Sequence, residues 1–114
     1  MKINLPSISL SLFVYYDFDT FAKECEFTEE QIGEYEDCNG LHSGNQIYIN
    51  LEEGTPHRTI IHELSHFIDW VFYRNFLQTS IFQATEIRAR ITEYCFDEIM
   101  KDVKDKINSH EGDD

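Results

Sequence analysis

The sequence is short of positive charge, of cysteine and of long apolar runs, and each shortage excludes a class of protein. Nine Lys and Arg residues against 22 Asp and Glu give a formal net charge of −13, which disfavours binding to nucleic-acid phosphates and to anionic membranes. The three cysteines are odd in number and form no C-x-x-C pair, so neither a disulfide framework nor a thiolate zinc site is expected. No stretch is long enough to span a membrane, and residues 1–16 lack the continuous apolar core of a signal peptide. These absences predict a cytoplasmic protein with free thiols.

The remaining composition is that of one folded domain. Hydrophobic residues make up 41% of the 114 residues, with nine Phe and six Tyr, which is typical of a globule with a single core. We expect the domain to cover residues 1–107 and the polar segment 108–114 to form a frayed acidic tail. Cys95 falls in an apolar stripe at helical spacing and is predicted to be part of the core.

Hydrophobic periodicity predicts an α+β fold, in which a small sheet of about three strands packs on two long helices. A hairpin turn is expected at Gly44-Asn45, between the second and third strands. The predicted strands are Ser7–Tyr16, Gly40–Ser43 and Gln46–Leu51, and the predicted helices are Thr20–Phe27, residues 56–74 and a last helix from Thr79 or Ser80 to Met100. Asp17 or Asp19 is the expected cap of the first helix and Thr55 that of the second, while the acidic stretch 28–37 is expected to be a solvated helix or loop.

The most specific feature of the sequence is His62-Glu63-Leu64-Ser65-His66, an H-E-x-x-H motif within an apolar periodic run. Residues four apart share one face of a helix, so the imidazoles of His62 and His66 can bind the same metal ion, for which Zn²⁺ is the expected choice. Glu63 lies about 100° further around the helix, where it can accept a proton from a water that the metal activates. The alternative interpretation is a pair of ordinary half-buried histidines flanked by core residues.

A catalytic zinc usually takes three protein ligands and leaves one position for water, so a third ligand must lie outside the motif helix. Glu86 is the predicted ligand because it lies twenty residues after His66, on a helix that returns antiparallel through a short connection. Glu93, two turns further along the same face, and Asp69 are the alternatives. We expect Asp69 instead to accept a histidine N–H and to fix its tautomer. The other interpretation of Glu86 is a surface ion pair with Arg90.

These residues resemble the gluzincin arrangement of thermolysin-type peptidases, in which the same interval separates the second histidine from the glutamate. The resemblance implies that His62, His66 and Glu86 bind zinc and that Glu63 is the general base. The chain departs from that family in two respects. Gluzincins carry an acidic residue four positions after the glutamate, where this chain has Arg90, and thermolysin-like enzymes have a second domain that supplies much of the substrate cleft.

A closer resemblance, over most of residues 5–100, is to small zinc metallopeptidases encoded by phages and prophages. The shared features are an N-terminal strand ending near Asp17, a Cys-Asn-Gly turn, an IYIN-like strand, the H-E-x-x-H motif, and a final helix with Glu86, Ala89 and Tyr94 in the pattern E-x-x-A-x-x-x-x-Y. Residues 47–86 are also similar to the metallopeptidase domain of ImmA/IrrE-type proteins, which cleave repressors. The resemblance implies a minimal zincin-like fold and, for a phage protein, a place in the host cytoplasm.

In zincins the edge strand ahead of the motif helix pairs with an extended peptide, so the resemblance assigns substrate binding to the strand that contains Gln46, Ile47, Tyr48 and Ile49. The alternative is an interior strand with no free backbone groups. The expected function is hydrolysis of a peptide or protein substrate by an endopeptidase with one zinc ion. The competing function is that of a phage accessory protein, in which four protein ligands hold a structural zinc and the acidic surface binds a host protein.

Overall fold

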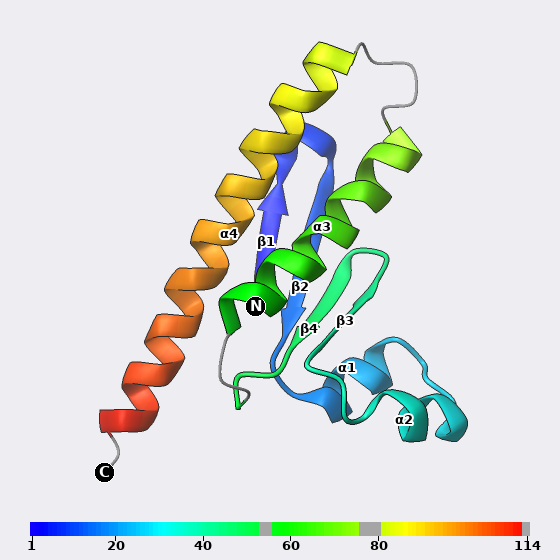
Figure 1. Cartoon of the computed structure of the whole chain (residues 1–114), viewed down its shortest axis with the longest axis vertical. Helices are drawn as coiled ribbons and strands as arrows, with labels where there is room; N and C mark the ends of the chain where they lie inside the picture. The colour runs from blue at the N-terminus through cyan, green and yellow to red at the C-terminus, as the bar shows by residue number, and fades with distance from the viewer. Residues whose placement is uncertain (53–55, 76–80, 113–114) are drawn as a thin grey trace.

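The computed structural model describes residues 1–52, 56–75 and 81–112, and side chains over 1–52, 56–73 and 85–107. In these residues the fold is α+β, with a four-stranded mixed sheet packed on two long helices and two shorter helices at one end (Figure 1). The strands are β1 (Lys2–Leu5), β2 (Leu10–Tyr15), β3 (Gly40–Ser43) and β4 (Gln46–Ile49), and the helices are α1 (Phe18–Glu24), α2 (Glu29–Tyr35), α3 (Pro56–Asn75) and α4 (Ile81–Gly112).

The strands follow the order β1-β2-β4-β3 across the sheet. β1 and β2 form an antiparallel pair, β2 and β4 run parallel, and β3 and β4 form an antiparallel hairpin. α3 packs on β4 and β3, while α4 returns beside α3 in the opposite direction and reaches β1 (Figure 1). The motif helix therefore lies along the β3 side of the sheet.

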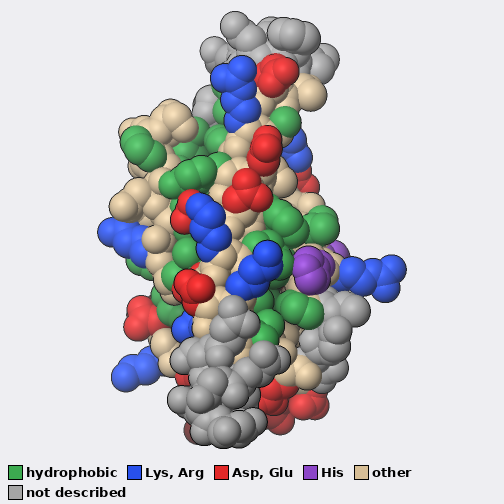
Figure 2. All heavy atoms as spheres, turned by 90° about the vertical axis from the view of Figure 1, so that its left-hand side faces the viewer, with side chains coloured by type: hydrophobic (Ala, Val, Ile, Leu, Met, Phe, Trp, Pro, Cys, Tyr) green, Lys and Arg blue, Asp and Glu red, His purple; other side chains and the backbone are tan. Residues whose placement is uncertain are grey.

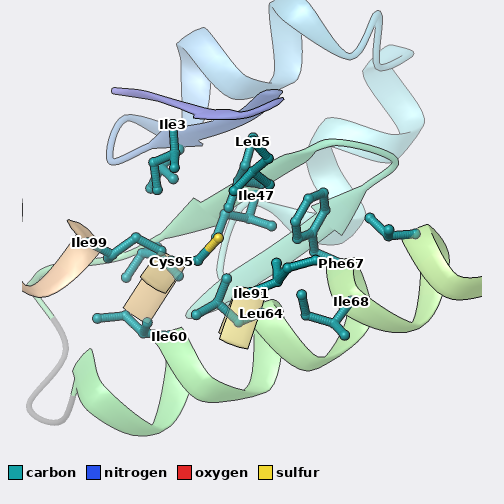
Figure 3. Packing of buried hydrophobic residues seen from close by; sticks show 14 of the residues in the cluster. Ile3, Leu5, Ile47, Ile60, Leu64, Phe67, Ile68, Ile91, Cys95 and Ile99 are labelled. Carbon is teal, nitrogen blue, oxygen red and sulfur yellow. The ribbon is translucent and has the colours of Figure 1, made fainter. Parts of the chain in front are cut away.

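The core lies between one face of the sheet and the two long helices (Figure 3). Alternate residues of β2 and β4 point into it, and α3 and α4 contribute apolar residues at helical spacing. Its fully or nearly fully buried members are Ile3, Leu5, Leu12, Val14, Ile47 and Ile49 from the strands and Ile60, Leu64, Phe67, Ile68, Val71, Phe72, Ile91, Cys95, Ile99 and Val103 from the helices. Burial of one such side chain contributes about 1.5–3 kcal/mol, so this cluster holds α3 firmly on the side away from its exposed histidines.

β4 is an interior strand, so the predicted peptide-binding edge is wrong. Gln46, Ile47 and Tyr48 pair with β2 on one side, and the whole strand to Ile49 pairs with β3 on the other. Its faces are covered as well, since Ile47 and Ile49 point into the core and Tyr48 packs on Phe21 of α1 with ring centroids 5.9 Å apart. Three consecutive buried residues are typical of an interior strand. Among the described strands, the edge next to α3 is β3.

The sheet has four strands instead of about three because the first residues of the chain form β1. A 3-10 turn at Pro6–Ile8, followed by Ser9 in the left-handed region, reverses the chain so that β1 pairs with β2. The predicted first strand consequently begins at Leu10 and not at Ser7. The pairing of β1 with β2 depends on contacts between two different stretches of the chain. The four residues of β1 by themselves give little indication that they form a strand.

Several local predictions are confirmed. The hairpin turns at Gly44-Asn45, the acidic stretch forms the exposed helix α2, and Cys95 is fully buried. Asp17 caps α1 by accepting a hydrogen bond of 3.0 Å from the Thr20 N–H. The expected cap Thr55 and the expected helix start at Thr79 or Ser80 lie outside the described residues.

The last helix is longer than predicted. α4 continues to Gly112 and includes most of the segment 108–114 that was expected to be a frayed tail. Within the described residues, neither α4 nor any other helix combines the length and the apolar character needed to cross a membrane.

Candidate metal centre

α3 presents its two motif histidines to solvent on one face. His62 and His66 are exposed, and their Nε2 atoms lie 3.2 Å apart; histidine side chains are visible at the surface in Figure 2. Two nitrogen ligands bound at roughly 2.0–2.1 Å to a tetrahedral zinc ion are about 3.3 Å from each other. The separation of the two imidazole nitrogens therefore fits one zinc ion.

Glu63 is buried, with 5% of its surface exposed, although both histidines beside it are open to solvent. Its Oε1 lies 3.9 Å from the Nε2 of His62. Burial raises the pKa of the Glu63 carboxyl above its ordinary value of 4.5, and the neighbouring His62 and His66 imidazoles oppose that rise. A raised pKa makes the carboxylate a stronger base, which suits it to accepting a proton.

The edge strand β3 covers Glu63 through Gly40. An added Cβ at Gly40 would lie 2.5 Å from Thr59 Cγ2 and 2.9 Å from Glu63 Cγ, so the absence of a side chain permits this close approach. An open pocket of about 560 Å³ adjoins the contact, and it is lined by Asp37, Cys38, Asn39, Gly40, Arg58, Thr59, His62 and Glu63. The carboxylate and one of the two histidines thus face the same pocket beside the sheet edge.

His42 joins the site, although no motif of the sequence points to it. It lies two residues after Gly40 on β3, and its ring stacks on that of His66 with centroids 5.9 Å apart. Its Nε2 donates a hydrogen bond of 2.8 Å to the carbonyl of Gly44. Burial lowers the pKa of His42, the bond to Gly44 partly opposes this shift, and the charge of His66 lowers the pKa further. Strand alternation places Gly40 and His42 on one face, but nothing local indicates that this face meets the motif helix.

The structure pairs Glu86 and Asp69 with arginines. Glu86 is exposed, and its Oε2 lies 3.8 Å from Arg90 Nε, which is the surface ion pair considered above. Asp69 accepts a hydrogen bond from Arg88 of α4, and Glu93 lines a pocket between α3 and α4. Over the part of the chain that the structure describes, no three His, Cys, Asp or Glu side chains are already arranged to hold a metal ion. The roles of Glu86 as third ligand and of Asp69 as orienting residue stay predictions.

No model of a protein family, no curated protein and no solved structure matches this chain. The site combines two imidazoles at the spacing of two zinc ligands, a buried carboxylate beside them, and the edge strand β3 next to the motif helix.

Proposed function

We propose that the chain is a zinc-dependent endopeptidase with a minimal zincin-like fold. The observation that carries the proposal is the geometry of α3, where the Nε2 atoms of His62 and His66 lie 3.2 Å apart and the carboxylate of Glu63 is buried beside them. Hydrolysis by an activated water needs a metal site and a base within reach of one another. α3 carries both within about two turns, and β3, an edge strand of the described sheet, lies beside it.

Glu63 is the proposed general base. When bound, zinc supplies a Lewis acid that activates water and polarises the peptide carbonyl. The Glu63 carboxylate accepts the proton of the attacking water and passes it to the leaving amine, which regenerates the carboxylate. Gly40 of β3 approaches this group closely, and the raised pKa of Glu63 favours its holding the proton between the two steps.

β3 is the proposed peptide-binding edge, in place of β4. In an antiparallel pair, residues whose N–H and C=O groups bond across the pair alternate with residues whose groups point away. The Asn50 N–H donates to the Asn39 carbonyl at 2.8 Å, so the hairpin register turns the backbone groups of Gly40 and His42 away from β4. An extended peptide can pair with those groups as an added strand, beside the pocket that contains Glu63.

The test separates metal binding from catalysis. Zinc per chain is measured after loading, and cleavage of an unfolded protein substrate is followed for the wild type, Glu63→Gln and Glu52→Gln. Glu52 is an exposed carboxylate outside the pocket and serves as the matched control. Because a general base contributes about 10²–10⁴-fold, we expect Glu63→Gln to keep its zinc and to lose activity by at least about 100-fold, while Glu52→Gln retains both.

Full activity in Glu63→Gln would refute the mechanism. A wild type that binds zinc tightly but cleaves no peptide would favour the competing function, a zinc-stabilised protein that binds a host protein through its acidic surface. The observation that favours this second candidate is the net charge of −13.

A further inference from the structure

The two histidines of α3 leave a zinc site one protein ligand short of the usual three. On the α4 side, the carboxylates of Asp69 and Glu86 each lie beside an arginine. On the β3 side, the ring of His42 lies against that of His66. We infer that His42 is the third protein ligand, so that the metal site consists of three histidines, two from the motif helix and one from the edge strand.

The rings of His42 and His62 each lie near the ring of His66, at separations close to those of imidazoles that share a metal ion. Two imidazoles bound to one tetrahedral zinc have ring centroids about 5 Å apart, given the Zn–N distance and the size of the ring. The centroids of His62 and His66 are 4.7 Å apart, and those of His42 and His66 are 5.9 Å apart. The planes of His42 and His66 are within 17° of parallel, so the His42 ring has to tilt before it can face the same ion.

The hydrogen bond of His42 leaves one particular nitrogen free. Metal-binding histidines almost always donate their other ring N–H to a carboxylate, a backbone carbonyl or a water, which fixes the tautomer. His42 Nε2 donates to the Gly44 carbonyl, so Nδ1 carries the lone pair of the neutral ring. Nδ1 is therefore the ligand atom of His42, whereas His62 and His66 bind through the Nε2 atoms that already face each other.

Two glycine contacts keep His42 close to α3. On one side of it, Gly40 approaches Glu63, and on the other side an added Cβ at Gly44 would lie 3.5 Å from the Trp70 ring. Two strand residues advance by about 6.6 Å and four helix residues by about 6.0 Å, so alternate residues of β3 meet successive turns of α3. The side chain between the two glycines consequently meets the turn that carries His66.

This inference rests on the proposed metal site but not on its activity, so the test measures zinc affinity alone, by competition with a chromophoric chelator. The variants are His42→Ala, Glu86→Ala and the matched control His57→Ala, an exposed histidine of α3 that does not line the pocket. Loss of a group that only supports a metal ligand weakens binding about 10–100-fold. We therefore expect His42→Ala to weaken zinc binding by roughly 100-fold or more, with little change in the other two variants.

A second measurement needs no variant and stays decisive even if His42→Ala does not fold. In the wild type with ¹⁵N-labelled histidine, zinc should shift the Nδ1 resonance of His42 and the Nε2 resonances of His62 and His66. The resonances of His57 should remain in place.

Unchanged zinc affinity in His42→Ala, together with unshifted His42 resonances, would overturn the inference and leave the proposed function standing. Loss of zinc from Glu86→Ala alone would assign the third position to Glu86. A wild type that binds no zinc would overturn the proposed function and this inference together.

Discussion

Replacing Gly40 by alanine adds one methyl group at the point where β3 touches α3. The new Cβ would lie 2.5 Å from Thr59 Cγ2 and 2.9 Å from Glu63 Cγ, whereas carbon atoms in contact prefer about 3.5–4.0 Å. The strand and the helix therefore have to separate by about 1 Å, or the Thr59 and Glu63 side chains have to turn away. Overpacking of this kind costs about 1–3 kcal/mol, which corresponds to a decrease in Tm of roughly 4–12 °C for a domain of this size.

The assay is thermal unfolding of the metal-free chain, with two comparison variants. Gly33→Ala in α2 is the matched control, because an added Cβ there meets nothing within 4 Å, and Gly→Ala within a helix stabilises by about 0.5–1 kcal/mol. Thr59→Ser removes the methyl group that clashes first, so the double variant with Gly40→Ala should regain part of the lost stability. Wild-type stability in Gly40→Ala, or strict additivity with Thr59→Ser, would show that β3 does not lie on Glu63 as described.

Two further predictions concern thiols and pH. Cys95 is fully buried and burial raises its pKa to about 12, so iodoacetamide should label Cys25 and Cys38 in the folded chain and Cys95 only after unfolding, as mass spectrometry can check. For Glu63, the folded-state pKa is raised above 4.5, so the folded chain binds the proton more tightly than the unfolded chain and stability falls as pH rises through the folded pKa. Metal-free Glu63→Gln should therefore be more stable than the wild type at about pH 8 and lose this advantage at about pH 4, as measured by urea unfolding. An advantage that does not change with pH would show that Glu63 is not desolvated.

The elements that the sequence predicts well are those specified by neighbouring residues. The motif helix has apolar residues at helical spacing and ends close to the predicted residue, and the Gly44-Asn45 turn defines its hairpin. Within the site, the convergence of His62 and His66 follows from the helical repeat alone, and the 3.2 Å between their nitrogens agrees with it. Such features need no knowledge of what lies across the core.

The features that the sequence does not reveal arise from pairing between distant segments. The residues of β4, Gln46–Ile49, do not indicate which strands lie beside them. Because β2 pairs with β4 in parallel, β4 is an interior strand and not the predicted edge. His42 is missed for the same reason, since its role depends on β3 lying against α3. The role of Gly40 also depends on long-range contacts. In the sequence Gly40 resembles an ordinary turn residue, and only the structure places Thr59 and Glu63 beside it.

The origin of the third ligand decides which parts of the fold the metal joins. A ligand at Glu86 would join α3 to α4, two helices that already share a core. A ligand at His42 would instead join α3 to β3, the strand whose outward backbone groups are proposed to bind the peptide. Metal binding stabilises the folded geometry that brings its ligands together, so a three-histidine site would position the peptide edge, the metal and Glu63 together. In a three-histidine site the same ion would therefore hold both the strand that is proposed to bind the peptide and the helix that carries Glu63.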